Sequence, residues 1–153
     1  MTPRQRAALA ALLEQRRVLA LGVLVDGAPH VGLLPFARSS DGTTLMVHAS
    51  RLARHARGLA AGAPFSALVH ADDDREADPL QVARATLEGT VEPLPRGTSA
   101  YAEARARYLA RLPSSAVTFE LGDFQLYALR VERGRLVLGF AQALDVLPED
   151  LAP

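Results

Sequence analysis

Apolar residues in this chain fall into short runs separated by turn residues, a pattern typical of a protein built mainly from β-strands. Residues 18–25 and 30–36 are apolar runs on either side of Asp26-Gly27. This arrangement predicts a β-hairpin, because Asp-Gly suits a tight two-residue turn. Asp41-Gly42 marks a second turn. Five further strands are predicted, at residues 43–49, 65–70, 81–91, 124–131 and 135–140, with a turn at Arg133-Gly134 between the last two.

Helical spacing appears before and between these strands. Leu9, Leu12 and Leu13 recur at helical intervals in residues 3–15, where Thr2 can cap the helix and Pro3 can occupy its first turn. Ser50 could cap a helix over residues 51–61. A further helix is predicted over residues 98–112, and a short one in the tail at 144–151. The acidic stretch 71–78 is expected to be a loop.

The succession of hairpins favours an antiparallel sheet closed into a small barrel. The predicted fold class is therefore mainly β with flanking helices (α+β). Residues 1–153 show no internal repeat or linker, so we expect a single domain.

Composition excludes several chemistries. The chain has no cysteine, which excludes disulfides and thiolate catalysis. All 17 basic residues are arginine, so no lysine can form a Schiff base. Formal net charge is zero, which suggests neither a nucleic acid nor a membrane surface as partner. No apolar run is long enough to span a bilayer and no signal-peptide pattern begins the chain, so a cytoplasmic bacterial protein is expected.

Common catalytic and nucleotide-binding motifs are also missing. The sequence contains no GxSxG, no GxGxxG and no GxxxxGK[ST] pattern. The four histidines lack the spacing of a helical metal site, and residues 71–78 lack that of an EF-hand. We therefore expect no metal site.

The segment 48–59 is the richest in candidate chemistry. It reads HASRLARHARGL, so a serine and several basic groups gather where a strand gives way to the predicted helix. The free N–H groups of a helix start attract anions, and the cations would strengthen a monophosphate site. An arginine-rich solvated surface explains the same pattern equally well. Arg84, inside an otherwise apolar strand, either binds an anion or faces outward and pairs with Glu88.

An ordered set of segments resembles a known family. The segments are HVGLLPFA, LMVHASRLARHARGLAAGAPFSALV, ARATLEGTV, YLARLP and DFQLYALRVERGRLVLGFAQA. Together they resemble the pyridoxamine 5′-phosphate oxidase-like FMN-binding split β-barrels, and the haem-utilisation (HugZ-like) branch most closely. The resemblance implies an FMN-binding split β-barrel that holds FMN at the interface of a homodimer.

The resemblance also implies where the cofactor would be bound. One strand would run along the flavin ring, the strand-to-helix junction would hold the phosphate, and the strand carrying Arg84 would support it. Phe140 would approach from the second subunit. The implied cofactor-binding residues are Leu33, Leu34, Pro35, Ala49, Ser50, Arg51, Leu52, Arg54, His55, Arg84 and Phe140. No catalytic residue is identifiable.

Three functions follow from this resemblance. The first is an FMN-dependent oxidoreductase of unknown substrate. The second is a non-catalytic flavin or haem binding or haem-utilisation protein, and the third is an F420-dependent reductase on the same fold. The tail DVLPEDLAP lacks the basic and aromatic set that binds pyridoxamine phosphate in the true oxidases, and the last histidine is His70, whereas haem degraders of this branch use a C-terminal one.

Overall fold

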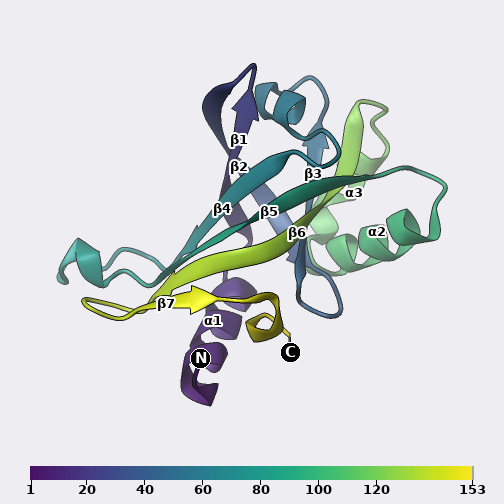
Figure 1. The fold of residues 1–153 in the computed structure, drawn as a ribbon. Coiled ribbons are helices and arrows are strands. Elements are labelled where there is room, and N and C mark those ends of the chain that lie inside the picture. The colour runs from purple at the N-terminus through teal and green to yellow at the C-terminus, as the bar shows by residue number, and fades with distance from the viewer. Residues whose placement is uncertain (153) are drawn as a thin grey trace.

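An antiparallel sheet dominates the structure, a computed structural model that describes residues 1–152 (Figure 1). Its strand order is β3-β2-β1-β4-β5-β6-β7, and an additional pairing of β3 with β6 closes the first six strands into a barrel. The strands are β1 (Val18–Val25), β2 (Ala28–Arg38), β3 (Thr44–Ser50), β4 (Pro64–His70), β5 (Arg84–Leu94), β6 (Phe124–Val137) and β7 (Ala143–Val146).

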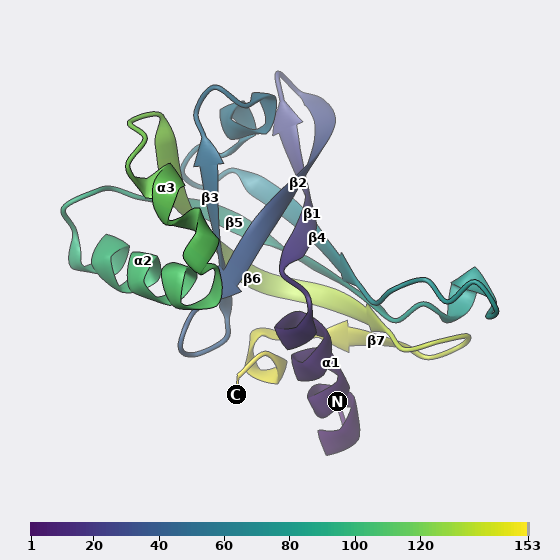
Figure 2. The same cartoon turned by 180° about the vertical axis from the view of Figure 1, so that it is seen from behind.

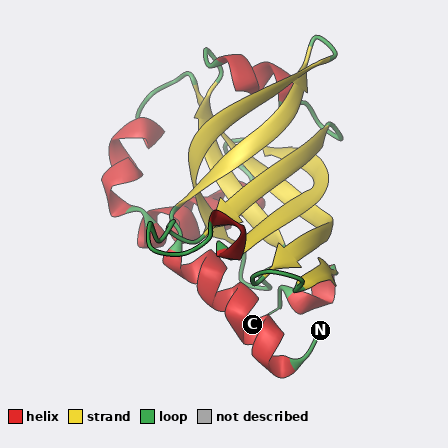
Figure 3. Ribbon diagram, turned by 90° about the vertical axis from the view of Figure 1, so that its left-hand side faces the viewer, coloured by secondary structure: helices red, strands yellow, loops and turns green. Residues whose placement is uncertain are grey.

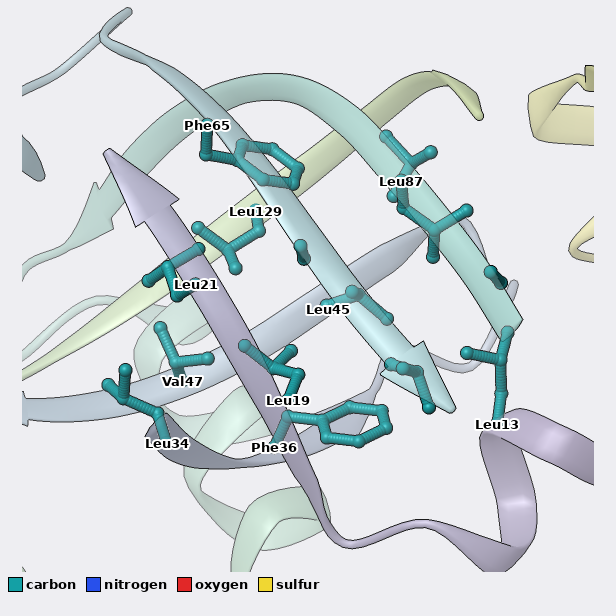
Figure 4. Packing of buried hydrophobic residues seen from close by; sticks show 14 of the residues in the cluster. Leu13, Leu19, Leu21, Leu34, Phe36, Leu45, Val47, Phe65, Leu87 and Leu129 are labelled. Atoms are coloured by element: carbon teal, nitrogen blue, oxygen red, sulfur yellow. The ribbon is translucent and has the colours of Figure 1, made fainter. Parts of the chain in front are cut away.

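Alternate residues of the strands fill the barrel with aliphatic and aromatic side chains. Leu19 and Leu21 of β1 point inward and meet Leu45, Phe65 and side chains from the other strands (Figure 4). Because side chains alternate between the two faces of a strand, the intervening residues of β1 and β2 lie on the outside of the barrel.

Helices cover parts of the barrel and leave other parts open. Helix α1 (Pro3–Gln15) begins at a capping box formed by Thr2 and Gln5 and buries its leucines in the barrel core. Helix α2 (Ser99–Arg111) and the short α3 (Ala116–Phe119) lie together beside β3, and the end of α2 meets the end of α1 (Figure 2; Figure 3 shows the helices around the sheet). Helices α2 and α3 build a second apolar cluster with β2, β3, β5 and β6, in which Tyr108 is the largest fully buried side chain.

The predicted fold class is confirmed: the structure is a mainly β six-stranded barrel with three flanking helices. The helix over residues 3–15 and the strand over residues 18–25 have the predicted bounds. Among residues 1–152, no helix combines the length and the apolar character needed to cross a membrane.

The predicted helix over residues 51–61 is wrong. The chain forms only a 3-10 turn, η1 (Arg54–Gly58), after an extended Ala53. The hydroxyl of Ser50 accepts the N–H of Leu52 at 3.1 Å, which makes a tight local turn instead of a helix cap. Gly58 then packs against the β1 backbone, where a Cβ would lie 2.7 Å from the carbonyl oxygen of Leu24.

Three further predictions also need correction. Strand β6 continues through Arg133-Gly134 as one element, so the predicted turn there is wrong. Strand β5 starts later than predicted because residues 79–81 form a 3-10 turn. It also ends later, because β4 flanks it only as far as Thr90 and Pro93 therefore lies where one side of the strand is an edge. The tail forms β7 and a 3-10 turn, η4 (Pro148–Asp150), in place of the predicted short helix.

Candidate functional site

The chain that leaves β3 forms a basic turn, which we define as Ser50, Arg51, Leu52, Arg54 and His55. The start of β6 holds it in place: the Ser50 hydroxyl donates to the Asp123 carboxylate, and the Arg51 N–H donates to the Asp123 carbonyl at 2.7 Å. The Arg51 side chain donates to the carbonyl of Gly122 at 3.1 Å. The first part of the basic turn is therefore fixed by its own hydrogen bonds.

The arginines that follow differ in their partners. Arg57 forms a 2.6 Å ion pair with Asp26 in the β1–β2 turn, so its charge is compensated. Arg54 is exposed and forms no ion pair within residues 1–152. Arg54 is thus the cation of this segment that is free to meet a ligand.

His55 packs its ring against β2. Gly32 makes the contact possible, because a Cβ at that position would lie 2.8 Å from His55 Nδ1. Within residues 1–152, His55 Nε2 is enclosed and has no hydrogen-bond partner. Burial lowers the pKa of His55 and the nearby His30 lowers it further. The basic turn therefore contains an enclosed polar atom without a protein partner and, at the preceding residue, a cation without an ion pair in the described chain.

The predicted cofactor-binding residues of β2 and β3 divide between the two faces of these strands. Leu33 is 71% exposed and Pro35 is also exposed, both on the outside of the barrel. Leu34 and Ala49 are buried in the core, so only their backbones can contact a bound molecule. Leu52 projects from the basic turn into solvent.

Arg84 and Phe140 form a separate pair, which we call the far-end group. They line one cavity of about 240 Å³ with Leu80, between the start of β5 and the loop after β6. Arg84 donates to the carbonyl of Val82 at 3.0 Å, and the Phe140 N–H donates to the Gln81 side chain at 3.1 Å. Arg84 does not pair with Glu88, which binds Arg133 instead.

The structure brings the basic turn together with β2, but it does not bring the far-end group to them. The basic turn lies beside the β1–β2 hairpin, at one end of the barrel. The far-end group lies at the opposite end, where β4 leads to the loop before β5 (Figure 1). One cofactor could contact both groups only if two chains supplied them.

Sequence reasoning missed Asp123 and Gly32. Asp123 meets Ser50 through the pairing of β3 with β6, which are far apart in the chain, and no local pattern signals that pairing. Gly32 did carry a signal, because a glycine inside an apolar strand often marks a close approach of another group.

Comparison with known proteins connects this geometry to a family. The family model described as Pyridoxamine 5′-phosphate oxidase matches residues 6–138. The chain is 29% identical over 141 residues to the haem oxygenase HutZ of Vibrio cholerae serotype O1, covering 90% of this chain and 78% of HutZ.

Solved structures agree on the fold. A haem binding protein from Mycobacterium smegmatis superposes with a TM-score of 0.84 at 25% identity, covering 99% of this chain and 61% of that protein. ChuZ of Campylobacter jejuni superposes with a TM-score of 0.82 at 18% identity, covering 99% of this chain and 63% of ChuZ. The chain thus spans about three fifths of these two structures.

Proposed function

Since the chain belongs to the pyridoxamine 5′-phosphate oxidase family, we propose that it is an FMN-binding flavoprotein that acts as an FMN-dependent oxidoreductase. The observation that carries this proposal is the basic turn, in which Arg54 has no acidic partner and His55 Nε2 has no hydrogen-bond partner within residues 1–152. A phosphate group supplies the negative charge and the acceptor atoms that both side chains lack.

The basic turn offers hydrogen-bond donors to a phosphate at two consecutive residues and is held in shape by two others. Arg54 can donate two parallel hydrogen bonds to a phosphate, and His55 can donate a third. Ser50 and the Arg51 backbone stay bound to Asp123 and hold the turn in shape. The flavin ring would extend along β2, where Leu33 offers an exposed apolar surface.

The bound flavin would supply hydride or electron transfer, and the protein would bind and orient it. Leu33 and Pro35 would cover part of the ring and exclude water from it. This division of labour requires no protein acid or base.

We further propose a homodimer in which the partner subunit completes the site. The far-end group lies at the opposite end of the barrel from the basic turn, so a second copy could bring its own arginine and phenylalanine to the flavin. Apolar side chains on the outside of β1 and β2, at Val18, Leu24, Val31 and Leu33, support contact with another protein surface.

Titration with FMN and with riboflavin, which lacks the phosphate, tests this proposal. We expect the protein to quench the fluorescence of FMN at concentrations where riboflavin stays free. In a double variant Arg54→Ala with His55→Ala, the preference for FMN should disappear, since charge-assisted hydrogen bonds contribute roughly 1.5–3 kcal/mol each.

Arg57→Ala is the matched control, because this arginine lies in the same segment and already pairs with Asp26. It should keep the preference for FMN over riboflavin. Failure of the protein to take up FMN would refute the flavoprotein assignment, and F420 uptake instead of FMN would indicate the reductase alternative. Equal FMN affinity of the double variant and the wild type would refute the phosphate site.

Haem binding is a second candidate function, supported by His70 and Arg84. The two residues are cross-strand neighbours on β4 and β5. His70 is exposed, and its Nδ1 lies 2.6 Å from the Ala71 carbonyl, which favours a proton on Nδ1 and leaves Nε2 as a possible iron ligand. Arg84 could pair with a haem carboxylate. HutZ, to which this chain is similar, is named a haem oxygenase.

Hemin titration separates the two functions. Haem ligation by this residue predicts a sharp Soret band that shifts in His70→Ala but not in His30→Ala. A Soret band unchanged by His70→Ala would place the iron ligand elsewhere. The absence of a sharp Soret band would refute haem binding and leave flavin binding as the proposed function.

A further inference from the structure

A cavity outside the barrel carries an excess of positive charge. It has a volume of about 320 Å³ and lies between α1, the C-terminal half of α2 and the turn that joins β2 to β3. Its charged lining residues are Glu14, Arg38, Arg107 and Arg111, and Ser39 and Ser40 add polar groups. It shares no residue with the basic turn or the far-end group.

Arg111 is the neutralised member of this lining. It donates to the Glu14 carboxylate at 3.1 Å and to the carbonyls of Leu13, Glu14 and Arg16 at the end of α1. Its role is structural, because it caps the carbonyl groups that a helix end leaves without partners.

Arg38 lacks an acidic partner within residues 1–152, although it is partly buried. Its guanidinium donates to the carbonyls of Leu151 at 2.5 Å and Gly42 at 3.4 Å, while Nε is enclosed without a hydrogen-bond partner. Burial lowers the pKa of Arg38, Glu14 counteracts this effect, and Arg111 adds to it. The hydrogen-bond partners of Arg38 are therefore neutral carbonyl groups.

Arg107 supplies the third positive charge from one helical turn before Arg111. It is exposed and forms no salt bridge within the described chain. With Glu14 paired to Arg111, neither Arg38 nor Arg107 forms an ion pair of its own within the described chain. Two guanidinium groups beside one hollow favour an oxyanion, because Arg107 can offer paired N–H donors and Arg38 can offer those of its Nη1.

We propose that this cavity binds a small doubly negative oxyanion, carried by a phosphoryl group or by a dicarboxylate. Arg38 and Arg107 bind the charge, and the Ser40 hydroxyl provides a further polar contact. The volume lies at the lower end of the range for small-molecule sites, about 300–1,000 Å³, so the ligand is one small metabolite or ion. Its binding ties α2 to the β2–β3 turn and stabilises the folded chain.

Thermal unfolding in the presence of inorganic phosphate or malonate, at constant ionic strength set with chloride, tests the proposal. We expect one of the two anions to raise the unfolding midpoint in a saturable manner, and isothermal calorimetry should give its affinity. Arg107→Ala should weaken that affinity about tenfold or more, since one charge-assisted hydrogen bond is lost. Which anion acts identifies the ligand class.

Two further variants make the result specific. Arg4→Ala removes another exposed arginine, from α1, and should leave the affinity unchanged. The double variant Arg54→Ala with His55→Ala should also leave it unchanged, so loss of binding there would assign the anion to the basic turn and overturn the proposal. An Arg107→Ala protein that binds like the wild type, an equal loss in Arg4→Ala, or no saturable effect of either anion would overturn it too.

Discussion

His48 is a buried ionisable side chain on β3 that belongs to neither group of candidate site residues. Its ring stacks on Phe119 with 3.8 Å between ring centroids, and its Nδ1 lies 3.0 Å from the Thr118 hydroxyl. Burial, with a smaller contribution from Arg96, lowers its pKa from 6.5 to about 4. The folded protein therefore holds His48 neutral where the unfolded chain would already be protonated.

This difference makes stability depend on pH. Between pH 6.5 and about 4 the unfolded chain binds a proton that the folded chain does not, so the free energy of unfolding falls as the pH decreases through this window. The loss amounts to roughly 3 kcal/mol and levels off at lower pH. We expect His48→Phe to remove this part of the pH dependence, measured by urea unfolding at pH 7 and pH 4.

Carboxylates that titrate in the same window are common to both proteins, so the difference between them isolates His48. The exposed His70 provides the control, and His70→Gln should retain the wild-type loss. If His48→Phe and the wild type lose equal stability, His48 is not the group responsible.

At the residue scale, the sequence named the candidate side chains, and their role in binding stays a prediction. Arg54 and His55 lie in the 3-10 turn η1, where the sequence predicted a longer helix. Their partners could not be predicted: Asp123 reaches Ser50 only through a long-range strand pairing, and the inward direction of Leu34 depends on the register of β2. A shift of one residue would have exchanged Leu33 and Leu34 between core and surface.

At the scale of elements, the long curved strands β5 and β6 depend on glycines that admit a neighbouring backbone. The register of this pair shifts between Glu88 and Gly89. A Cβ at Gly89 would lie 1.8 Å from the carbonyl oxygen of Arg130, and one at Gly134 would lie 2.5 Å from that of Thr86. Both positions are closed to a side chain by backbone atoms, which cannot move aside as a flexible side chain would.

We expect Gly89→Ala to destabilise the protein by about 2 kcal/mol or more, because the two strands must separate to admit a methyl group. Gly122→Ala is the matched control, since a Cβ there has no neighbour within 4 Å. It should change the free energy of unfolding by less than about 0.5 kcal/mol. Urea unfolding of the two variants decides the question, and a Gly89→Ala protein as stable as the control would show that the bulge can absorb the side chain.

The same glycines explain why element boundaries were harder to predict than element types. Arg133-Gly134 resembles a turn in sequence, but its glycine serves the close approach of β5 to β6 inside one continuous strand. Gly58 similarly allows the chain after η1 to pack on β1, and a helix over residues 51–61 would not. In both cases a contact between distant segments outweighs the local pattern.

At the scale of the whole molecule, the outer face of β1 and β2 is the surface on which the proposed dimer depends. Val31 lies opposite Gly22 and next to a groove of about 470 Å³ on the barrel surface. Helix α2 covers the end of β2 at Ala37, whereas Val31 and Leu33 stay exposed. Exposed aliphatic side chains on a sheet face favour burial against a second protein surface.

Two substitutions, Val31→Asp and Val117→Asp, test whether the dimer forms through this face, because they make the same chemical change at two exposed positions. Val31 on β2 is 66% exposed and Val117 on α3 is 65% exposed, so a monomer should tolerate the two substitutions equally. We expect sedimentation to show a dimer for the wild type and for Val117→Asp, and a monomer for Val31→Asp, because a carboxylate in the interface would lose its hydration without gaining a partner. The monomer should also bind FMN more weakly than the dimer, since the partner subunit would no longer supply the far-end group.

A Val31→Asp protein that stays dimeric at low concentration would place the interface on a different face, and a wild type that is monomeric would leave the far-end group without a role in the flavin site.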